Sequence, residues 1–378
     1  MCLLPHDERE QSKTGRTVAV GKAVGAVLAH DITEIIPGEF KGCAFRKGHV
    51  IRQEDICRLQ RLGKEHLFVL DIADDEIHED EAARALAEAL VGEGVRPGGG
   101  PREGKINILA ARPGLLRVNR HALCELNRLG DVVCATLHDN TVVQEGQIVG
   151  GTRAIPLIIK RRIVEEAVNI ACAGRKILAV KEMRKPKAGV VITGSEVYYG
   201  RIQDGFGPVI RKKIEGYGGE VKGIYFAPDD DTFIAARLRE LIDDGCDLLI
   251  TTGGMSVDPD DVTRFAIRHL GAEETVYGSP VLPGSMFLVA YLKNSNKSSV
   301  MSNALKKEEG SSSCPSQIPI LGIPACGLHD KVTVFDLLLP RVLAGEKIGR
   351  NELAELGHGG LCMHCPECRY PVCPFGKA

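Results

Sequence analysis

The feature that most constrains the fold is a regular alternation of short apolar runs and amphipathic segments between residues 190 and 270. The apolar runs have the length of buried strands and lie at residues 190–193, 220–226 and 247–252. The amphipathic segments have apolar residues at helical spacing and lie at residues 207–216, 233–242 and 262–270. Strands separated by helices of about ten residues indicate βαβ units. We therefore predict an α/β domain with a mostly parallel sheet that is covered on both faces.

The remaining sequence falls into regions of different composition. With 378 residues, the chain has room for two or three domains of about 150 residues each. A turn-rich stretch at residues 96–104 predicts a boundary near residue 100, followed by an α+β connecting region over residues 101–186. Residues 293–317 are poor in apolar side chains, which predicts a surface insertion in an α/β domain over residues 187–345. Residues 346–378 then form a Cys-rich tail.

The charge balance excludes several classes of partner. Lys and Arg number 48 and Asp and Glu number 50, so the formal net charge is −2. Such a chain has no overall positive field to attract nucleic acid or an anionic membrane. The N-terminal residues lack the apolar run of a secretory signal, and the apolar stretches fall short of the ~20 residues of a membrane span. We expect a cytoplasmic protein without nucleic-acid or membrane partners.

Small, hydroxyl-bearing and acidic residues follow the predicted strands at the points where these end. The carboxyl ends of parallel strands meet at one edge, where open α/β sheets bind ligands. Loops of this kind present backbone N–H groups to a phosphate or a similar oxyanion, and nearby carboxylates can hold Mg²⁺. The candidate binding residues are Thr193, Gly194, Ser195, Glu196, Asp204, Gly253, Gly254, Ser256, Pro283, Gly284, Ser285 and Pro324.

A simpler interpretation of the same residues remains open. The glycines can make tight turns between strands and helices, and the aspartates can cap helices. Asp261 would then cap the helix over residues 262–270, and Asp231 or Thr232 would cap the helix over residues 233–242. Three such loops at one edge of one sheet favour a binding site over capping alone.

The order of these motifs is more specific than any one of them. The stretches TGSEV, GRIQDG, PDDD, DLLITTGGMSVDPDDVT, LPGS and GIP follow one another along the chain. This order resembles the molybdopterin-binding domain of molybdenum-cofactor biosynthesis proteins, the MogA/MoeA/gephyrin superfamily that CinA shares. The resemblance covers about residues 187–345 and implies a three-layer α/β/α domain that binds the pterin and its phosphate. It also implies a phosphate loop of Gly253, Gly254 and Ser256, with Asp261 and Asp229 as catalytic acids and Mg²⁺ as cofactor.

A second resemblance concerns the N-terminal part. The segments AVGAVLAHDI and RKGHVIRQEDICRLQRLGKEHLFV are similar to the extension that precedes the binding domain in MoeA-type, molybdate-inserting members. Residues 1–100 are therefore interpreted as a shortened MoeA-like region. The sequence departs from that pattern where Lys41 begins a Lys-Gly-Cys-Ala stretch in place of Asp-Gly-Tyr-Ala, and where Asp258 replaces a glycine of the phosphate loop.

The resemblance implies two alternative functions. The first is an enzyme that adenylylates molybdopterin or inserts molybdate, with ATP or AMP and molybdate as further ligands. The second is a non-catalytic molybdopterin carrier that delivers the cofactor to an apo-molybdoenzyme, which the departures at Lys41 and Asp258 favour. A CinA-like nucleotide hydrolase would share the domain, but nothing outside the domain supports it. The relatives also suggest a homo-oligomer.

Four cysteines close together near the C-terminus predict a metal site. Cys362, Cys365, Cys368 and Cys373 have the spacing C-x₂-C-x₂-C-x₄-C and are followed by a proline. This pattern is one residue longer than the bacterial ferredoxin run. Four thiolates within twelve residues suit a tetrahedral Zn²⁺ or an iron–sulfur cluster, and the sequence leaves this choice open. The tail would then act as a docking element or a sensor.

Overall fold

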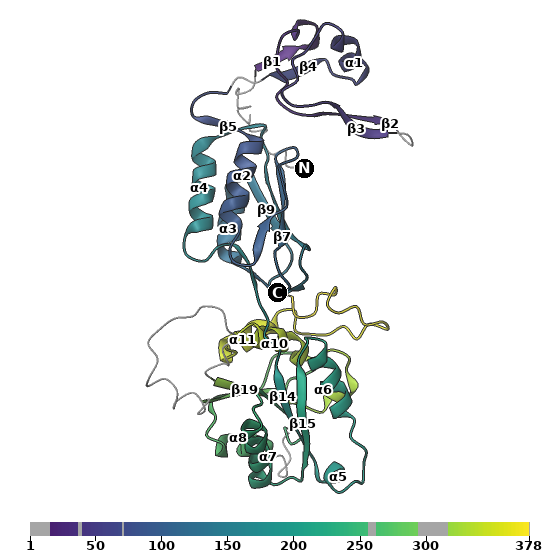
Figure 1. The fold of residues 1–378 in the computed structure, drawn as a ribbon, viewed down its shortest axis with the longest axis vertical. Helices are drawn as coiled ribbons and strands as arrows, with labels where there is room; N and C mark the ends of the chain where they lie inside the picture. Colours follow the sequence, from purple (N-terminus) through teal and green to yellow (C-terminus); the bar gives the residue numbers. More distant parts are fainter. Residues whose placement is uncertain (1–15, 37–39, 70–71, 256–261, 294–316, 378) are drawn as a thin grey trace, which may run out of the picture. The chain divides into compact units, whose positions relative to one another are not determined.

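The computed structural model describes residues 16–36, 40–69, 72–255, 262–293 and 317–377. The chain divides into two compact units, which Figure 1 shows. Unit 1 contains Met1–Leu137 and Val143–Val180, and unit 2 contains His138–Val142 and Lys181–Ala378. Of the predicted insertion over residues 293–317, all but the first and last residues lie outside the described ranges.

A six-stranded sheet forms the centre of unit 2, with the strand order β15-β14-β16-β19-β18-β17. The first four strands in this order are parallel, whereas β18 is antiparallel to both of its neighbours. The predicted mostly parallel sheet is confirmed, and the antiparallel strand makes it a mixed one. The strands are β14 (Lys187–Thr193), β15 (Glu220–Ala227), β16 (Leu248–Thr252), β17 (Glu273–Tyr277), β18 (Leu288–Lys293) and β19 (Gln317–Ile323).

Both faces of this sheet carry helices. Val190 and Ile250 belong to a core with α6 and α10, whereas Val191 and Leu249 belong to a second core with α7 and α8. The central strands therefore contribute apolar side chains to both faces, as buried parallel strands do. The helices of unit 2 are α5 (Ser195–Tyr198), α6 (Phe206–Glu215), α7 (Asp231–Asp243), α8 (Thr263–His269), α9 (Cys326–His329), α10 (Val334–Leu343), α11 (Arg350–Ala354) and η3 (Glu355–Gly357).

Unit 1 begins with a β-rich part that has its own small core around Leu28 and Leu59. In this part β1 pairs with β4, and β2 pairs with β3 in a hairpin. Its elements are β1 (Arg16–Ala19), η1 (Val20–Lys22), β2 (Ile32–Ile36), β3 (Phe40–Phe45), α1 (Asp55–Arg61) and β4 (His66–Val69). The N-terminal region of the chain is thus β-rich.

The rest of unit 1 combines helices with a four-stranded sheet in the order β6-β7-β11-β9. α2 packs on this sheet and on α4, and Leu86 of α2 is fully buried in their common core. The elements are β5 (Glu76–His78), α2 (Glu79–Leu90), β6 (Val95–Pro97), β7 (Lys105–Ala110), β8 (Gly114–Val118), α3 (Arg120–Arg128), β9 (Val132–Thr136), β10 (Val142–Val143), β11 (Ile148–Ala154), β12 (Ile158–Lys160), α4 (Arg161–Cys172) and β13 (Leu178–Lys181).

The helices throughout the described ranges are short. α7, with 13 residues, is as long as any of them. Within these ranges, no helix has both the length and the apolar character needed to cross a membrane.

Candidate functional site

The predicted binding loops leave the unit 2 sheet at one edge. In the register of the sheet, Thr193 at the end of β14 pairs with Ala227 at the end of β15. Thr252 at the end of β16 likewise pairs with Ile323 at the end of β19. Because the four strands are parallel, the loops that follow them share the carboxyl edge, where α/β sheets bind ligands.

The hairpin of β17 and β18 reaches the same edge. Leu288, the first residue of β18, pairs with Gly322 of β19, so the loop that leads into β18 lies beside the end of β19. The Tyr277 hydroxyl at the end of β17 donates a hydrogen bond to the carbonyl of Met255 in the loop after β16. This bond joins the β17 end of the hairpin to the loop after β16, which contains Gly253 and Gly254.

The turn after β16 depends on its two glycines. Gly253 and Gly254 have φ values of 78° and 57°, in the left-handed region. A Cβ at Gly253 would lie 2.6 Å from the carbonyl oxygen of Thr193, and a Cβ at Gly254 would lie 2.3 Å from the hydroxyl of Thr263. Both positions therefore require glycine, for conformation and for space.

Hydrogen bonds from two threonine side chains hold the backbone of this turn. The Thr193 hydroxyl donates to the carbonyl of Thr252 at 2.8 Å, and the Thr263 hydroxyl donates to the carbonyl of Gly253 at 3.2 Å. The predicted binding residue Thr193 thus has a positioning role in the structure. Thr263 was not among the predicted site residues, although the DDVT stretch that contains it belongs to the most specific motif.

The first loop contains a reciprocal pair. The backbone N–H of Ser195 donates to the Asp229 carboxylate at 2.9 Å, and the backbone N–H of Asp229 donates to the Ser195 hydroxyl at 3.4 Å. These bonds join the loop after β14 to the loop after β15. Gly194 has a φ of 135°, and a Cβ there would lie 2.6 Å from an oxygen of Glu196, whose side chain is exposed.

Other aspartates of this region accept hydrogen bonds from the first N–H groups of helices. The Asp204 carboxylate accepts from the N–H groups of Phe206 and Gly207, at 2.7 and 3.1 Å, in the first turn of α6. The prediction that Asp231 or Thr232 caps α7 is wrong, because Asp230 is the N-cap and accepts from the N–H of Phe233 at 2.7 Å. Hydrogen bonds from the Thr232 hydroxyl and from backbone N–H groups hold the pKa of Asp230 below its usual range.

The remaining predicted loop residues lie at the hairpin side of the edge. Gly284, with a φ of 127°, packs so closely on α10 that a Cβ would lie 2.5 Å from a methyl carbon of Val334. Pro283 follows a cis peptide bond, and Ser285 is exposed. Pro324 directly follows β19 and is partly buried. Ser256 and Asp261 lie outside the described residues, so their predicted roles stay predictions.

Two hydroxyls at the end of β16 are buried without a hydrogen-bond partner in the part of the chain that the structure describes. Within the described residues, the hydroxyls of Thr251 and Thr252 have no hydrogen-bond partner, and both side chains are fully buried. A buried polar group without a partner costs about 1–3 kcal/mol, so its presence calls for an explanation. Because Thr251 and Thr252 are neighbours in a strand, their side chains point to opposite faces of the sheet and do not converge on one ligand. The feature that fits a phosphate is the turn of two left-handed residues, which presents backbone N–H groups to anions.

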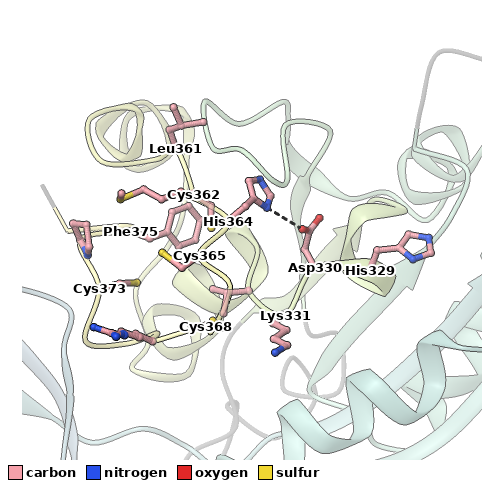
Figure 2. A pocket seen from close by; sticks show the side chains of 14 residues that line it. His329, Asp330, Lys331, Leu361, Cys362, His364, Cys365, Cys368, Cys373 and Phe375 are labelled. Atoms are coloured by element: carbon pink, nitrogen blue, oxygen red, sulfur yellow. Dashed lines mark ion pairs between the residues drawn. The ribbon is translucent and has the colours of Figure 1, made fainter.

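The four cysteines of the tail lie around one cavity of about 200 Å³, together with His364 and Asp330 (Figure 2). None of the four is in a disulfide. Within the described ranges, no group of three or more His, Cys, Asp or Glu side chains is already arranged to hold a metal ion. The predicted metal site on these cysteines therefore stays a prediction.

Two regions of the chain match known protein families. Residues 189–343 match a family described as a probable molybdopterin binding domain, and residues 17–71 match a domain of unknown function. Among curated proteins, a CinA-like protein of Mycobacterium avium is 38% identical over 95 residues, which are 25% of this chain and 22% of that protein. A CinA-like protein of Mycobacterium tuberculosis (strain H37Rv) is 40% identical over 88 residues, 23% of this chain and 20% of that protein. The chain thus spans about a fifth of the length of these curated relatives.

Solved structures of small cofactor-biosynthesis proteins are also similar to part of the chain. The tungsten cofactor synthesizing protein MoaB from Pyrococcus furiosus is 17% identical, with a TM-score of 0.31, over 42% of this chain and 96% of that one. The molybdopterin biosynthesis enzyme MoaB from Thermus thermophilus is 22% identical, with a TM-score of 0.31, over 43% of this chain and 98% of that one.

The family match and the sheet coincide. The matched residues 189–343 begin in β14 and end with α10, so they include the six strands and the loops at their shared edge. Residues 189–343, which include the sheet and the loops at its carboxyl edge, therefore match the family described as a probable molybdopterin binding domain.

Proposed function

We propose that this protein binds molybdopterin at the carboxyl edge of the unit 2 sheet and acts in molybdenum-cofactor biosynthesis. The observation that carries the proposal is the turn of Gly253 and Gly254, which Thr193 and Thr263 fasten at the edge where the other loops also end. A fastened turn holds its N–H groups in place before the ligand arrives, so little ordering free energy is lost on binding.

Each loop has a separate task in this proposal. The glycine turn holds the terminal phosphate, with Ser256 as a further donor. The backbone N–H of Ser195 donates to the Asp229 carboxylate, and this bond keeps the Ser195 hydroxyl near the same edge. Ser285 is exposed at the hairpin side and donates to polar groups of the pterin. Molybdopterin itself supplies the dithiolene sulfurs that receive the metal.

For the reaction, we favour adenylylation of the pterin or Mg²⁺-dependent insertion of molybdate. Asp261 stands close in sequence to the glycine turn, and in this proposal its carboxylate holds Mg²⁺. A divalent ion there would neutralise charge that develops on the phosphate during transfer. Asp229 is the second acidic residue in this role.

The second candidate is a non-catalytic carrier, and one observation favours it. The carboxylates of Asp229 and Asp204 each accept hydrogen bonds from backbone N–H groups, so both already have a structural task. Carboxylates engaged in this way support the loops of a binding site without any transfer chemistry. ATP and molybdate would then have no effect on the bound pterin.

A titration of the full-length chain with molybdopterin tests the binding proposal. The chain contains no Trp, so pterin fluorescence can be followed without Trp emission. Ser195→Ala should weaken binding about tenfold or more, which corresponds to one lost hydrogen bond to a charged ligand. Asp243→Asn, at the exposed end of α7, is the matched control and should bind like the wild type.

The reaction is tested in the same samples by adding Mg-ATP and molybdate. Formation of adenylylated pterin or release of AMP supports the enzyme, and Asp261→Asn should slow that step while the chain stays folded. Tight pterin binding without turnover supports the carrier. Hydrolysis of ATP in the absence of any pterin affinity would instead point to a nucleotide hydrolase and would refute the proposal.

A further inference from the structure

The Cys-rich segment at the end of unit 2 is held in place although it has almost no regular secondary structure. Phe375 is 4% exposed and belongs to the core beneath α10. The Tyr370 hydroxyl donates to the carbonyl of Asp336 in α10 at 3.2 Å. The N–H of Gly376 donates to the carbonyl of Gly359 at 2.9 Å, so the two ends of the segment meet.

The segment is thus a closed loop with its four cysteines inside it. Cys365 and Cys368 are exposed, whereas Cys362 and Cys373 are partly buried, and all four line the same cavity (Figure 2). Fixing the ends of a loop removes the closure part of the conformational entropy that a ligand would otherwise have to overcome. A metal ion would therefore have to order side chains and a short stretch of backbone rather than a whole tail.

The surroundings of the cavity suit several thiolates. Lys331, Arg369 and Asp330 all line it, so two positive charges and one negative charge surround the site and would offset part of the net negative charge of a metal held by four thiolates. Exposed thiols without a ligand oxidise readily, which makes a metal-free cluster of four unfavourable in a cell. Sulfur ligands at this spacing select zinc or an iron–sulfur cluster over harder metals.

The same segment contacts the hairpin loop of the candidate site. The N–H of Leu282 donates to the carbonyl of Gly360 at 2.8 Å, and the N–H of Cys362 donates to the carbonyl of Leu282 at 2.8 Å. These bonds form a short parallel bridge between Leu282 and Leu361. Leu282 directly precedes the predicted binding residues Pro283, Gly284 and Ser285.

We infer that Cys362, Cys365, Cys368 and Cys373 hold one thiolate-ligated metal centre that fixes the hairpin loop through its bridge to Leu282. Among the described residues no three of these side chains converge on one point, and in this proposal the exposed Cys365 and Cys368 turn inward when the metal binds. The centre does not depend on whether the neighbouring edge binds molybdopterin.

Anaerobic purification of the full-length chain, followed by metal and sulfide analysis, tests the centre. We expect either one zinc per chain without visible colour, or iron and acid-labile sulfide in equal amounts with brown colour. Cys368→Ser should lose most of this metal, whereas Cys124→Ser, at an exposed cysteine of unit 1, should keep it. A chain that stays metal-free after incubation with Zn²⁺, and after reconstitution with iron and sulfide, would overturn the inference.

Hydrogen exchange tests the effect on the loop. In the metal-free Cys368→Ser variant, the amides of the 282–287 segment should exchange at least several-fold faster than in the loaded wild type. Amides of β14, whose strand partners are β15 and β16, should not change. Equal exchange of the hairpin loop in both proteins would show that the centre does not fix it. Neither readout uses the pterin, so the inference and the proposed function can fail independently.

Discussion

Gly254→Ala is the substitution that tests most directly whether the glycine turn is held by its neighbours. The residue has a φ of 57°, and an added Cβ would lie 2.3 Å from the Thr263 hydroxyl. Alanine therefore meets two obstacles, a strained backbone and a collision. Gly271→Ala is the matched control, because Gly271 has a φ of 80° and nothing within 4 Å of an added Cβ.

The two substitutions separate the two contributions. Alanine in the left-handed region costs about 1 kcal/mol, which is the whole effect expected for Gly271→Ala. At Gly254 the Thr263 hydroxyl must also move away and give up its bond to the carbonyl of Gly253, which adds about 1–3 kcal/mol. We therefore expect a loss of about 2–4 kcal/mol for Gly254→Ala.

A second background removes the collision. In a Thr263→Ala protein the hydroxyl at 2.3 Å is gone, and the Thr193 hydroxyl and the Cβ of residue 263 remain at 3.3 Å, so Gly254→Ala should cost little more than the control substitution. The difference between the two backgrounds is the coupling energy between the two positions. Since a chain of two units need not unfold in one step, the free energy of unfolding should be read by urea-dependent hydrogen exchange of β14 and β16 peptides. Equal costs for Gly254→Ala and Gly271→Ala in the wild-type background would refute the reasoning.

Three further predictions concern buried polar groups. Burial raises the pKa of Glu79 from 4.5 to about 7, so the fold favours the neutral acid and loses stability as the pH rises from about 4.5 to 7. Glu79→Gln should leave the free energy of unfolding unchanged at pH 4 and raise it at pH 8 by up to about 3 kcal/mol. Hydrogen exchange of the α2 amides measures this difference, and a difference that does not change with pH would contradict the prediction. Arg341→Met removes the buried partner of Glu346, to which it is bonded at 2.8 and 2.9 Å, and should destabilise unit 2 by about 3 kcal/mol, measured by urea-dependent hydrogen exchange of β14 and β16 peptides. A loss below about 1 kcal/mol would mean that water already screens the pair. Thr193→Val keeps the shape of the side chain but loses the hydrogen bond to the carbonyl of Thr252. The free energy that protects the β16 amides from hydrogen exchange should therefore fall by about 1–3 kcal/mol. Unchanged exchange would show that the hydroxyl is not needed there.

The sequence predicts the regular elements of unit 2 well because their signals are local. The predicted helices over residues 207–216, 233–242 and 262–270 correspond to α6, α7 and α8, with ends that differ by no more than two residues. Each is defined by apolar residues at helical spacing and by flanking glycines, which act within the segment itself. Strand length and the helices between strands were likewise enough to predict parallel pairing.

The exact cap of α7 could not be predicted from the run of three aspartates. Asp230 has extended backbone angles, with φ −132° and ψ 120°, whereas Asp231 is already the first helical residue. A cap requires that change of backbone conformation, and any of the three aspartates could supply the side chain. The strand directions at the hairpin edge posed a similar problem, because the apolar run of β18 is compatible with either direction.

The roles of individual site residues depended on contacts between distant segments. Asp229 and Ser195 are 34 residues apart, and Thr193 and Thr263 are 70 residues apart, yet each pair meets at the carboxyl edge. The sequence could place these residues at the same edge, but it could not tell a ligand contact from a support for the backbone. The distinction is a matter of which atom each hydroxyl or carboxylate faces.

The candidate site has two halves, and they differ in which part of the chain holds them in place. The half formed by β14 and β16 is held by side chains of the domain itself, namely Thr193, Thr263 and the Asp229–Ser195 pair. The hairpin half contacts α10 through Gly284 but is bonded along its backbone to the Cys-rich segment through Leu282. Within the described ranges, the half formed by β14 and β16 is therefore held without any contribution from the Cys-rich segment. The hairpin half is held within the domain, where the N–H of Val334 donates to the carbonyl of Pro283 at 3.3 Å, and also by a segment outside the matched residues 189–343. We therefore predict that loss of order in the Cys-rich segment loosens the hairpin half and leaves the half at β14 and β16 unchanged.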